Sequence, residues 1–94
     1  MLHMVCLQGV VDDVKTLIDA GADVNARADF GIVPLHRAVG ASDQRAALTI
    51  VRMLLAAGAD PNVTNEFGNT PLTKATERSW LDIAEEIIAA GGVG

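Results

Sequence analysis

The chain has 94 residues with seven basic and twelve acidic side chains, a formal net charge of -5, and half of its residues are hydrophobic although only three are aromatic. This length limits the chain to one domain, and the acidic balance argues against a nucleic-acid-binding protein, which would carry a basic surface. Because no apolar stretch approaches the roughly 18 residues of a membrane span, no signal peptide is evident and the single cysteine excludes an internal disulfide, we expect a cytoplasmic protein that contacts no membrane.

The apolar periodicity, interrupted by glycine and proline, predicts helices in chain order near residues 2–8, 11–20, 35–41, 44–57, 72–78 and 81–90. Pro34 and Pro71 suit the first turn of a helix, where a missing N–H costs nothing. Thr70 can cap the helix that follows it. Residues 23–33 and 60–70 are predicted to form two projecting loops, which we call the first and second fingers.

Internal repetition sets the register of these elements. The segment LIDAGADVNAR (17–27) recurs as LLAAGADPNVT (54–64), and FGIVPLHRA (30–38) recurs as FGNTPLTKA (67–75). Gly21, Gly58 and Gly91 follow apolar helical runs and suit the left-handed residue that ends a helix. Gly31 and Gly68 suit tight turns that need a positive φ.

The spacing divides residues 1–94 into three repeats, approximately 1–22, 23–59 and 60–94. Gly58 and Gly91 are 33 residues apart, whereas Gly21 and Gly58 are 37 apart. The middle repeat therefore carries four additional residues near 40–46, about one helical turn. We expect them to lengthen the second helix of that repeat at the end away from the fingers, with Ser42 or Asp43 as its cap.

The pattern G-x-T-P-L-H-x-A followed by I-V-x-x-L-L-x-x-G-A-D-x-N resembles the ankyrin repeat over essentially the whole chain. The resemblance implies an all-α solenoid of helix–turn–helix pairs joined by hairpin-like finger loops. It also implies that His3 and His36 hold neighbouring repeats together through backbone hydrogen bonds. Val33 replaces the usual threonine, so the helix after Pro34 lacks a hydroxyl cap.

A catalytic interpretation would start from Cys6, His3 and His36 with an acid such as Asp12 or Asp29, because a thiolate–imidazole pair can form a nucleophile. We favour structural roles, because Cys6 stands at an inward-facing repeat position, where a cysteine is usually inert packing. One cysteine and two distant histidines give no metal-ligand cluster. The acidic pairs Asp12-Asp13 and Glu85-Glu86 are read as a solvated helix face. We therefore expect no enzyme activity, no cofactor and no metal.

The resemblance implies a protein–protein interaction module that binds its partner through the fingers and the exposed side of the first helices. Leu7 and Gln8 lie on that path. Ile32 is the preferred anchor, because the second finger has a polar residue in its place. Phe30 and Phe67 fit packing under each finger as well as partner contact. The predicted partner-binding residues are Arg27, Asp29, Phe30, Ile32, Thr64, Glu66, Phe67, Asn69, Glu77 and Arg78.

The two ends of the array are expected to be incompletely capped and to leave apolar area exposed. The residues concerned are Leu2, Val5 and Val14 at one end and Ile83 and Ile87 at the other. Such ends would fit a piece of a longer array, a partner, or self-association with a second copy. Trp80 is expected to pack against the preceding helix turn, the alternative being an exposed anchor on the convex side. The rival function is an accessory or regulatory domain of a larger enzyme, with its chemistry elsewhere.

Overall fold

The structure, a computed structural model, describes residues 2–92. Its elements are α1 (Leu2–Gln8), α2 (Val11–Asp19), the short 3-10 helix η1 (Asp29–Gly31), α3 (Pro34–Ala38), α4 (Gln44–Ala56), α5 (Pro71–Glu77) and α6 (Leu81–Ala89). The all-helical prediction is confirmed, and no β-strand occurs between residues 2 and 92. Within that range no helix has the length and apolarity needed to cross a bilayer.

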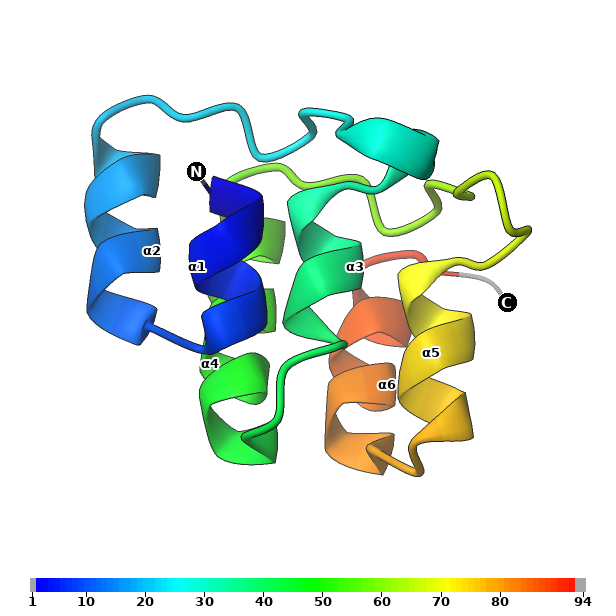
Figure 1. Ribbon diagram of the computed structural model, residues 1–94. Coiled ribbons are helices and arrows are strands. Elements are labelled where there is room, and N and C mark those ends of the chain that lie inside the picture. The colour runs from blue at the N-terminus through cyan, green and yellow to red at the C-terminus, as the bar shows by residue number, and fades with distance from the viewer. Residues whose placement is uncertain (1, 93–94) are drawn as a thin grey trace.

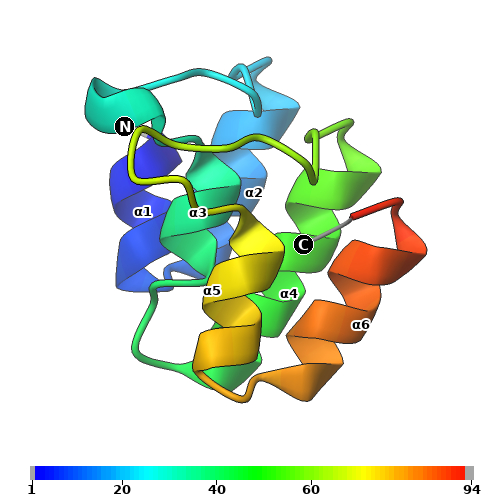
Figure 2. The same cartoon turned by 90° about the vertical axis from the view of Figure 1, so that its right-hand side faces the viewer.

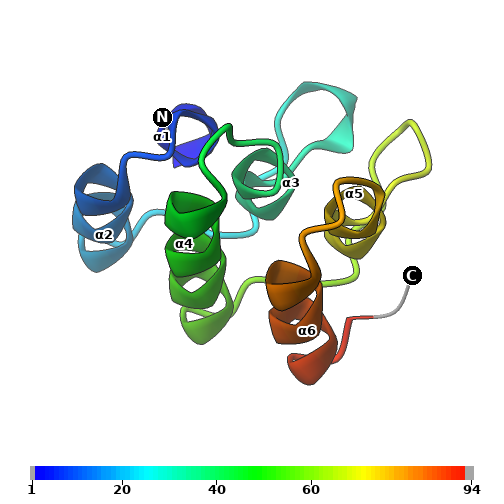
Figure 3. The ribbon, with the colours of Figure 1, turned by 90° about the horizontal axis from the view of Figure 1, so that it is seen from below.

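The helices form two rows (Figure 1). Seen from below, α1, α3 and α5 make an inner row and α2, α4 and α6 an outer row, and the fingers project from the inner side (Figure 3). Turning the molecule by 90° shows the two fingers lying one beside the other above the inner helices (Figure 2). The inner row and the fingers therefore meet at an angle. We call the surface inside this angle, formed by both, the inner surface.

Local sequence explains where the helices begin. Thr70 accepts a hydrogen bond on its hydroxyl from the backbone N–H of Thr73 at 3.2 Å, as predicted for the cap of α5. Val33 has no hydroxyl, and α3 is fixed differently: the Val33 N–H donates to Nδ1 of His36 at 3.1 Å. The His36 ring thus satisfies the Val33 N–H, while the His36 N–H, which a threonine hydroxyl would have bonded, donates to the Val33 carbonyl at 3.0 Å.

The helix ends also follow the predicted chemistry. Gly21, Gly58 and Gly91 all have positive φ, between 90° and 99°, and Gly31 and Gly68 have φ of 70° and 80°. These φ values confirm the five predictions of left-handed glycines. Glycine suits these positions because an L side chain would be strained at such angles.

The four-residue insertion lies where it was predicted. Helix α4 has 13 residues whereas α2 and α6 have nine each, and the side chain of Asp43 caps it by accepting from the N–H groups of Arg45 and Ala46. Helix α3 ends at Ala38, three residues before its predicted end. Beyond Ala38 the N–H groups of Gly40 and Ala41 close tight turns onto the Arg37 and Ala38 carbonyls. The carbonyls of Val39 and Ala41 accept hydrogen bonds from a side chain of the next repeat.

That side chain is Arg78. One guanidinium nitrogen, Nη1, donates to Val39 at 3.0 Å and to Ala41 at 2.6 Å, and the guanidinium carbon lies 3.7 Å from the centre of the Trp80 ring. Trp80 is buried, with 8% of its surface exposed. The prediction that Trp80 packs against the preceding helix turn is confirmed, and Arg78 joins the second and third repeats.

The core is aliphatic and continuous through the three helix pairs. Leu35, Ile50 and Leu54 are fully buried within it. The prediction of apolar ends was wrong for each residue named: Leu2, Val5, Val14, Ile83 and Ile87 are all buried. The periodicity identified an apolar helix face correctly, but these side chains pack within their own helix pair and against the adjoining repeat.

Candidate functional site

The two fingers have the same backbone frame with different side-chain support. The N–H of Ala28 donates to the carbonyl of Ile32 at 2.7 Å, and the N–H of Asn65 donates to the carbonyl of Asn69 at 3.0 Å. In the second finger the Asn65 side-chain oxygen also accepts from the N–H groups of Phe67 and Asn69. Ala28 has no such oxygen, and the first finger instead closes through the 3-10 turn η1.

This difference places Phe30 in an unusual conformation. Its φ is 65°, which costs a bulky side chain free energy that glycine would not lose. The strain accompanies contacts with the other finger: the Phe30 carbonyl accepts from the N–H of Glu66 at 2.8 Å, and the Phe30 and Phe67 ring centres are 5.4 Å apart. Both rings stay more than half exposed. The aromatic residues therefore pair across the fingers while keeping a face toward solvent.

Two histidines connect the inner row to the fingers in equivalent ways. Nε2 of His3 lies 2.8 Å from the Ala26 carbonyl and 3.2 Å from that of Ile32, and Nε2 of His36 lies 3.1 Å from the carbonyl of Asn69. Since Nδ1 of His36 accepts from Val33, Nε2 carries the proton and donates. Burial lowers the pKa of His36, which keeps the ring neutral. The implied role of both histidines is confirmed.

A second repeated contact fixes the base of each finger. The Asn25 side chain donates to the Gly58 carbonyl at 3.1 Å and accepts from the Asp60 N–H at 2.7 Å. Asn62, at the same place in the next repeat, donates to the Gly91 carbonyl at 3.1 Å. The fingers are thus held on a rigid frame, as a surface for specific binding requires.

A hollow of about 290 Å³ lies where the inner helices meet the fingers. Its lining is contributed by both, and includes no acidic residue: Leu7, Ile32, His36, Arg37, Gly40, Asn65, Asn69 and Lys74. A smaller recess of His3, Met4, Leu7 and Arg37 adjoins it and shares two of these residues. The hollow combines two cations, two amides and two aliphatic side chains at the junction on which the predicted partner surface centres.

The predicted partner-binding residues divide into three groups in the structure. Ile32 and Asn69 line the hollow, together with Leu7. The finger residues are exposed around it: Arg27, Asp29, Phe30, Thr64, Glu66 and Phe67. Glu77 and Arg78 lie at the far end of α5 from the fingers. Because the Arg78 guanidinium already binds two carbonyls and Trp80, we no longer count Arg78 among the candidate partner-binding residues.

Three functional candidates escaped the sequence prediction. Arg37, Lys74 and Asn65 line the hollow, yet the predicted set contains none of them. The repeat register could have identified two of them, because Arg37 and Lys74 each stand three residues after the proline of their repeat. Met4 likewise stands three residues after Met1. The repeat therefore places these three side chains at one equivalent position along the inner row.

The residues of the catalytic interpretation are engaged in structural contacts. Cys6 is fully buried, and this burial raises the pKa of its thiol to about 12. Both histidines use Nε2 for finger carbonyls. Asp12 and Asp13 are exposed on α2, and among residues 2–92 no group of three or more His, Cys, Asp or Glu side chains could hold a metal ion.

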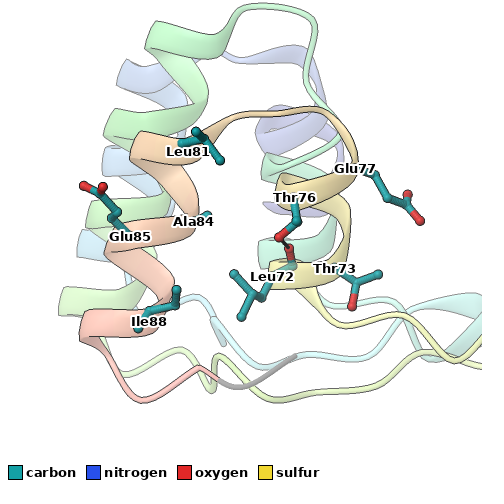
Figure 4. Close-up of a pocket in the computed structure, with 8 residues that line it drawn as sticks. All are labelled: Leu72, Thr73, Thr76, Glu77, Leu81, Ala84, Glu85 and Ile88. Atoms are coloured by element: carbon teal, nitrogen blue, oxygen red, sulfur yellow. Dashed lines mark hydrogen bonds between the residues drawn. The ribbon is translucent and has the colours of Figure 1, made fainter.

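A second surface is the groove between α5 and α6, which has a volume of about 600 Å³. Figure 4 shows Leu72, Leu81 and Ile88 turned toward the groove, while Glu77 and Glu85 point away at its edges. Leu81 and Ile88 are more than half exposed. Apolar area is therefore exposed at this end of the array, but on residues other than the predicted Ile83 and Ile87.

The groove corresponds to a face that the second repeat buries. The residues equivalent to Leu72, Thr76 and Ala84 are Leu35, Val39 and Val51, and these three are fully buried. Thr76 is exposed, and its hydroxyl donates to the Leu72 carbonyl at 2.7 Å. The groove is thus the face on which each earlier repeat packs against its successor.

Comparison with known proteins agrees with this architecture. Residues 1–29 match the family described as ankyrin repeat, and residues 41–85 match the family described as ankyrin repeats in many copies. A crystal structure of an ankyrin repeat domain from Acinetobacter baumannii is similar with a TM-score of 0.93 and 34% identity, over 98% of this chain and 47% of that one. Neurogenic locus notch homolog protein 2 from Homo sapiens and from Mus musculus is 41% identical over 51 residues, which is 54% of this chain and 2% of those proteins.

Proposed function

Because this chain is an ankyrin-repeat domain, and such repeats are generally protein-interaction modules, we propose that it binds a partner protein on its inner surface without catalysing a reaction. The bound partner contacts the fingers and the exposed side of α1, α3 and α5. The outer row serves as the support.

The observation that carries this proposal is the division of side chains between scaffold and surface. The polar groups that join the repeats are each bonded to backbone of the following repeat: His3 and His36 to finger carbonyls, and the Asn25 side-chain oxygen to the Asp60 N–H. By contrast, Arg37 and Lys74 form no ion pair within residues 2–92, Lys74 is exposed and Arg37 half-buried, and the finger residues Phe30 and Phe67 keep more than half of their surface exposed. Aromatic and arginine side chains on a rigid frame are the usual composition of a protein interface.

Site-specific photo-crosslinking tests the proposal. A photoreactive phenylalanine analogue replaces Phe67 on the second finger in one variant and Asp12 on the outer helix α2 in a matched variant. Both positions are exposed, so folding should be unchanged. We expect a discrete crosslinked partner from position 67, diminished by Ile32→Asp, and none from position 12. Crosslinking to the same partner from position 12 alone would place the interface on the outer row and refute the proposal.

A further inference from the structure

The hollow at the inner surface is lined by positively charged side chains, although the protein as a whole is acidic. Arg37 and Lys74 line it, and Arg27 and Arg37 lie close enough to His36 for their charges to act on that ring. In the described residues, the two ion pairs are Lys15–Asp19 and Arg52–Glu86, and both lie on outer helices. The charges of Arg37 and Lys74 are therefore not neutralised by a contact within the fold.

The acidic groups of the inner surface do not cancel these charges. Asp29 and Glu66 belong to the fingers and Glu77 to the far end of α5, and none of the three lines the hollow. None forms an ion pair with the cations of the hollow in residues 2–92. The charged side chains that line the hollow are thus both cations, although the chain as a whole carries -5.

Amide donors supplement the two cations. The Asn65 side-chain oxygen is occupied by two backbone N–H groups, which leaves its NH₂ as the group available for a ligand. The side chain of Asn69 makes no hydrogen bond within residues 2–92, where only its backbone atoms are engaged. An anionic oxygen is the acceptor that such a set of donors fits, because hydrogen bonds that involve a charged group are the strongest of their kind.

The neighbouring surface is apolar. Met4 is 62% exposed and Leu7 41% exposed, and they form the adjoining recess with His3 and Arg37. Ile32 closes the finger side of the hollow. An occupant that satisfies the whole region therefore needs a negative group next to an aliphatic one.

We propose that the hollow binds a carboxylate of an acidic partner segment, with an aliphatic side chain of the same segment packed on Met4 and Leu7. This deepens the function proposed above and rests on it. Arg37 and Lys74 supply the charge, Asn65 and Asn69 supply neutral donors, and the chain's own net charge restricts binding of other acidic surfaces to this place.

An NMR titration of the intact 94-residue chain tests the proposal. The probe is a short blocked peptide containing four glutamates and two leucines, and the control peptide has glutamine in place of each glutamate. We expect the glutamate peptide to shift the side-chain amide signals of Asn65 and Asn69 and to bind about tenfold or more tightly than the control. Raising the salt concentration should weaken only the glutamate peptide.

Charge-reversal variants locate the interaction. Arg37→Glu and Lys74→Glu should each weaken the glutamate peptide about fivefold or more, because each removes an attraction and adds a repulsion. Arg45→Glu on α4 makes the same change in net charge outside the hollow and should stay within about twofold. If either reversal perturbs folding, Arg37→Gln and Lys74→Gln should still weaken binding, by a smaller factor.

Several outcomes would overturn the inference. Equal binding of both peptides at the inner surface would refute the carboxylate preference while leaving the proposed protein-binding function intact. Equal losses in the Arg37, Lys74 and Arg45 variants would show that net charge, not the hollow, controls binding. Absence of binding by the glutamate peptide would refute the site, and tighter binding of a single-stranded oligonucleotide would assign the cations to nucleic acid instead.

Discussion

Replacement of Arg78 by alanine should destabilise the fold strongly, although the residue lies on the surface side of a turn. Its guanidinium donates to the carbonyls of Val39 and Ala41, both of which are fully buried residues, and covers the ring of Trp80. A hydrogen bond from a charged group contributes about 1.5–3 kcal/mol, and a partly exposed cation–π contact about 0.5–1 kcal/mol. Because Arg78 is half-buried, we discount the sum for solvent and expect a loss of about 2–4 kcal/mol in the free energy of unfolding.

Urea unfolding followed by far-UV circular dichroism measures this loss without depending on the fluorescence of the single tryptophan, which Arg78 contacts. Arg78→Lys should retain part of the stability, because an ammonium keeps the charge but lacks the planar group that covers Trp80. Arg45→Ala, a change at an exposed arginine, should stay within about 0.5 kcal/mol. If Arg78→Ala costs no more than Arg45→Ala, the guanidinium does not hold the second and third repeats together, and Arg78 returns to the candidate partner surface.

Four further predictions follow from burial and backbone geometry. Ser79 has φ of 57°, so Ser79→Gly should raise the free energy of unfolding by about 0.5–1 kcal/mol in urea titrations, and a decrease would contradict backbone strain there. Ile87→Ala should cost about 2–5 kcal/mol but Ile88→Ala only about 0.5 kcal/mol, since Ile87 is fully buried and Ile88 is 56% exposed; similar costs would show the burial to be wrong. The buried Cys6 thiol, with its pKa raised to about 12, should react with a thiol reagent at neutral pH only as fast as the protein opens, and rapid labelling of folded protein would argue against this. The folded-state pKa of His36 is lowered, so its contribution to stability should be complete above the unfolded pKa of about 6.5 and decline as the pH falls toward the folded value. If the free energy of unfolding instead rises on acidification in this window in wild type but not in His36→Gln, this assignment is refuted.

The repeat register allowed most of the fold to be predicted, because each repeated residue has a local physical role. Proline at the first turn and glycine after the last turn specify helix boundaries, and a four-residue difference in spacing located the insertion and its Asp43 cap. The end of α3 could not be predicted in this way. Beyond Ala38 the chain forms tight turns whose Val39 and Ala41 carbonyls bind Arg78, a contact over 37 residues from Ala41 that no local pattern specifies.

Apolar periodicity had a second limit at the ends of the array. It identifies the apolar face of a helix but does not tell which neighbour covers each side chain, so buried Ile87 and exposed Ile88 are equally apolar in the sequence. Likewise, Phe30 and Phe67 occupy one place in their repeats, but a contact between the two rings depends on how closely the fingers approach. Distances between repeats are properties of the packed structure.

Comparing equivalent residues of successive repeats also separates the side chains of the hollow from side chains that hold the repeats together. Some side chains that join one repeat to the next are the same in successive repeats, since the geometry they satisfy is the same. His3 and His36 are the example, because each bonds a carbonyl of the following finger. The position of Met4, Arg37 and Lys74 differs, because it holds an aliphatic thioether in one repeat and cations in the next two. The side chains of Arg37 and Lys74 make no hydrogen bond or ion pair within residues 2–92, unlike that of Arg78, so they are free from the demands of stacking and can distinguish a partner's sequence.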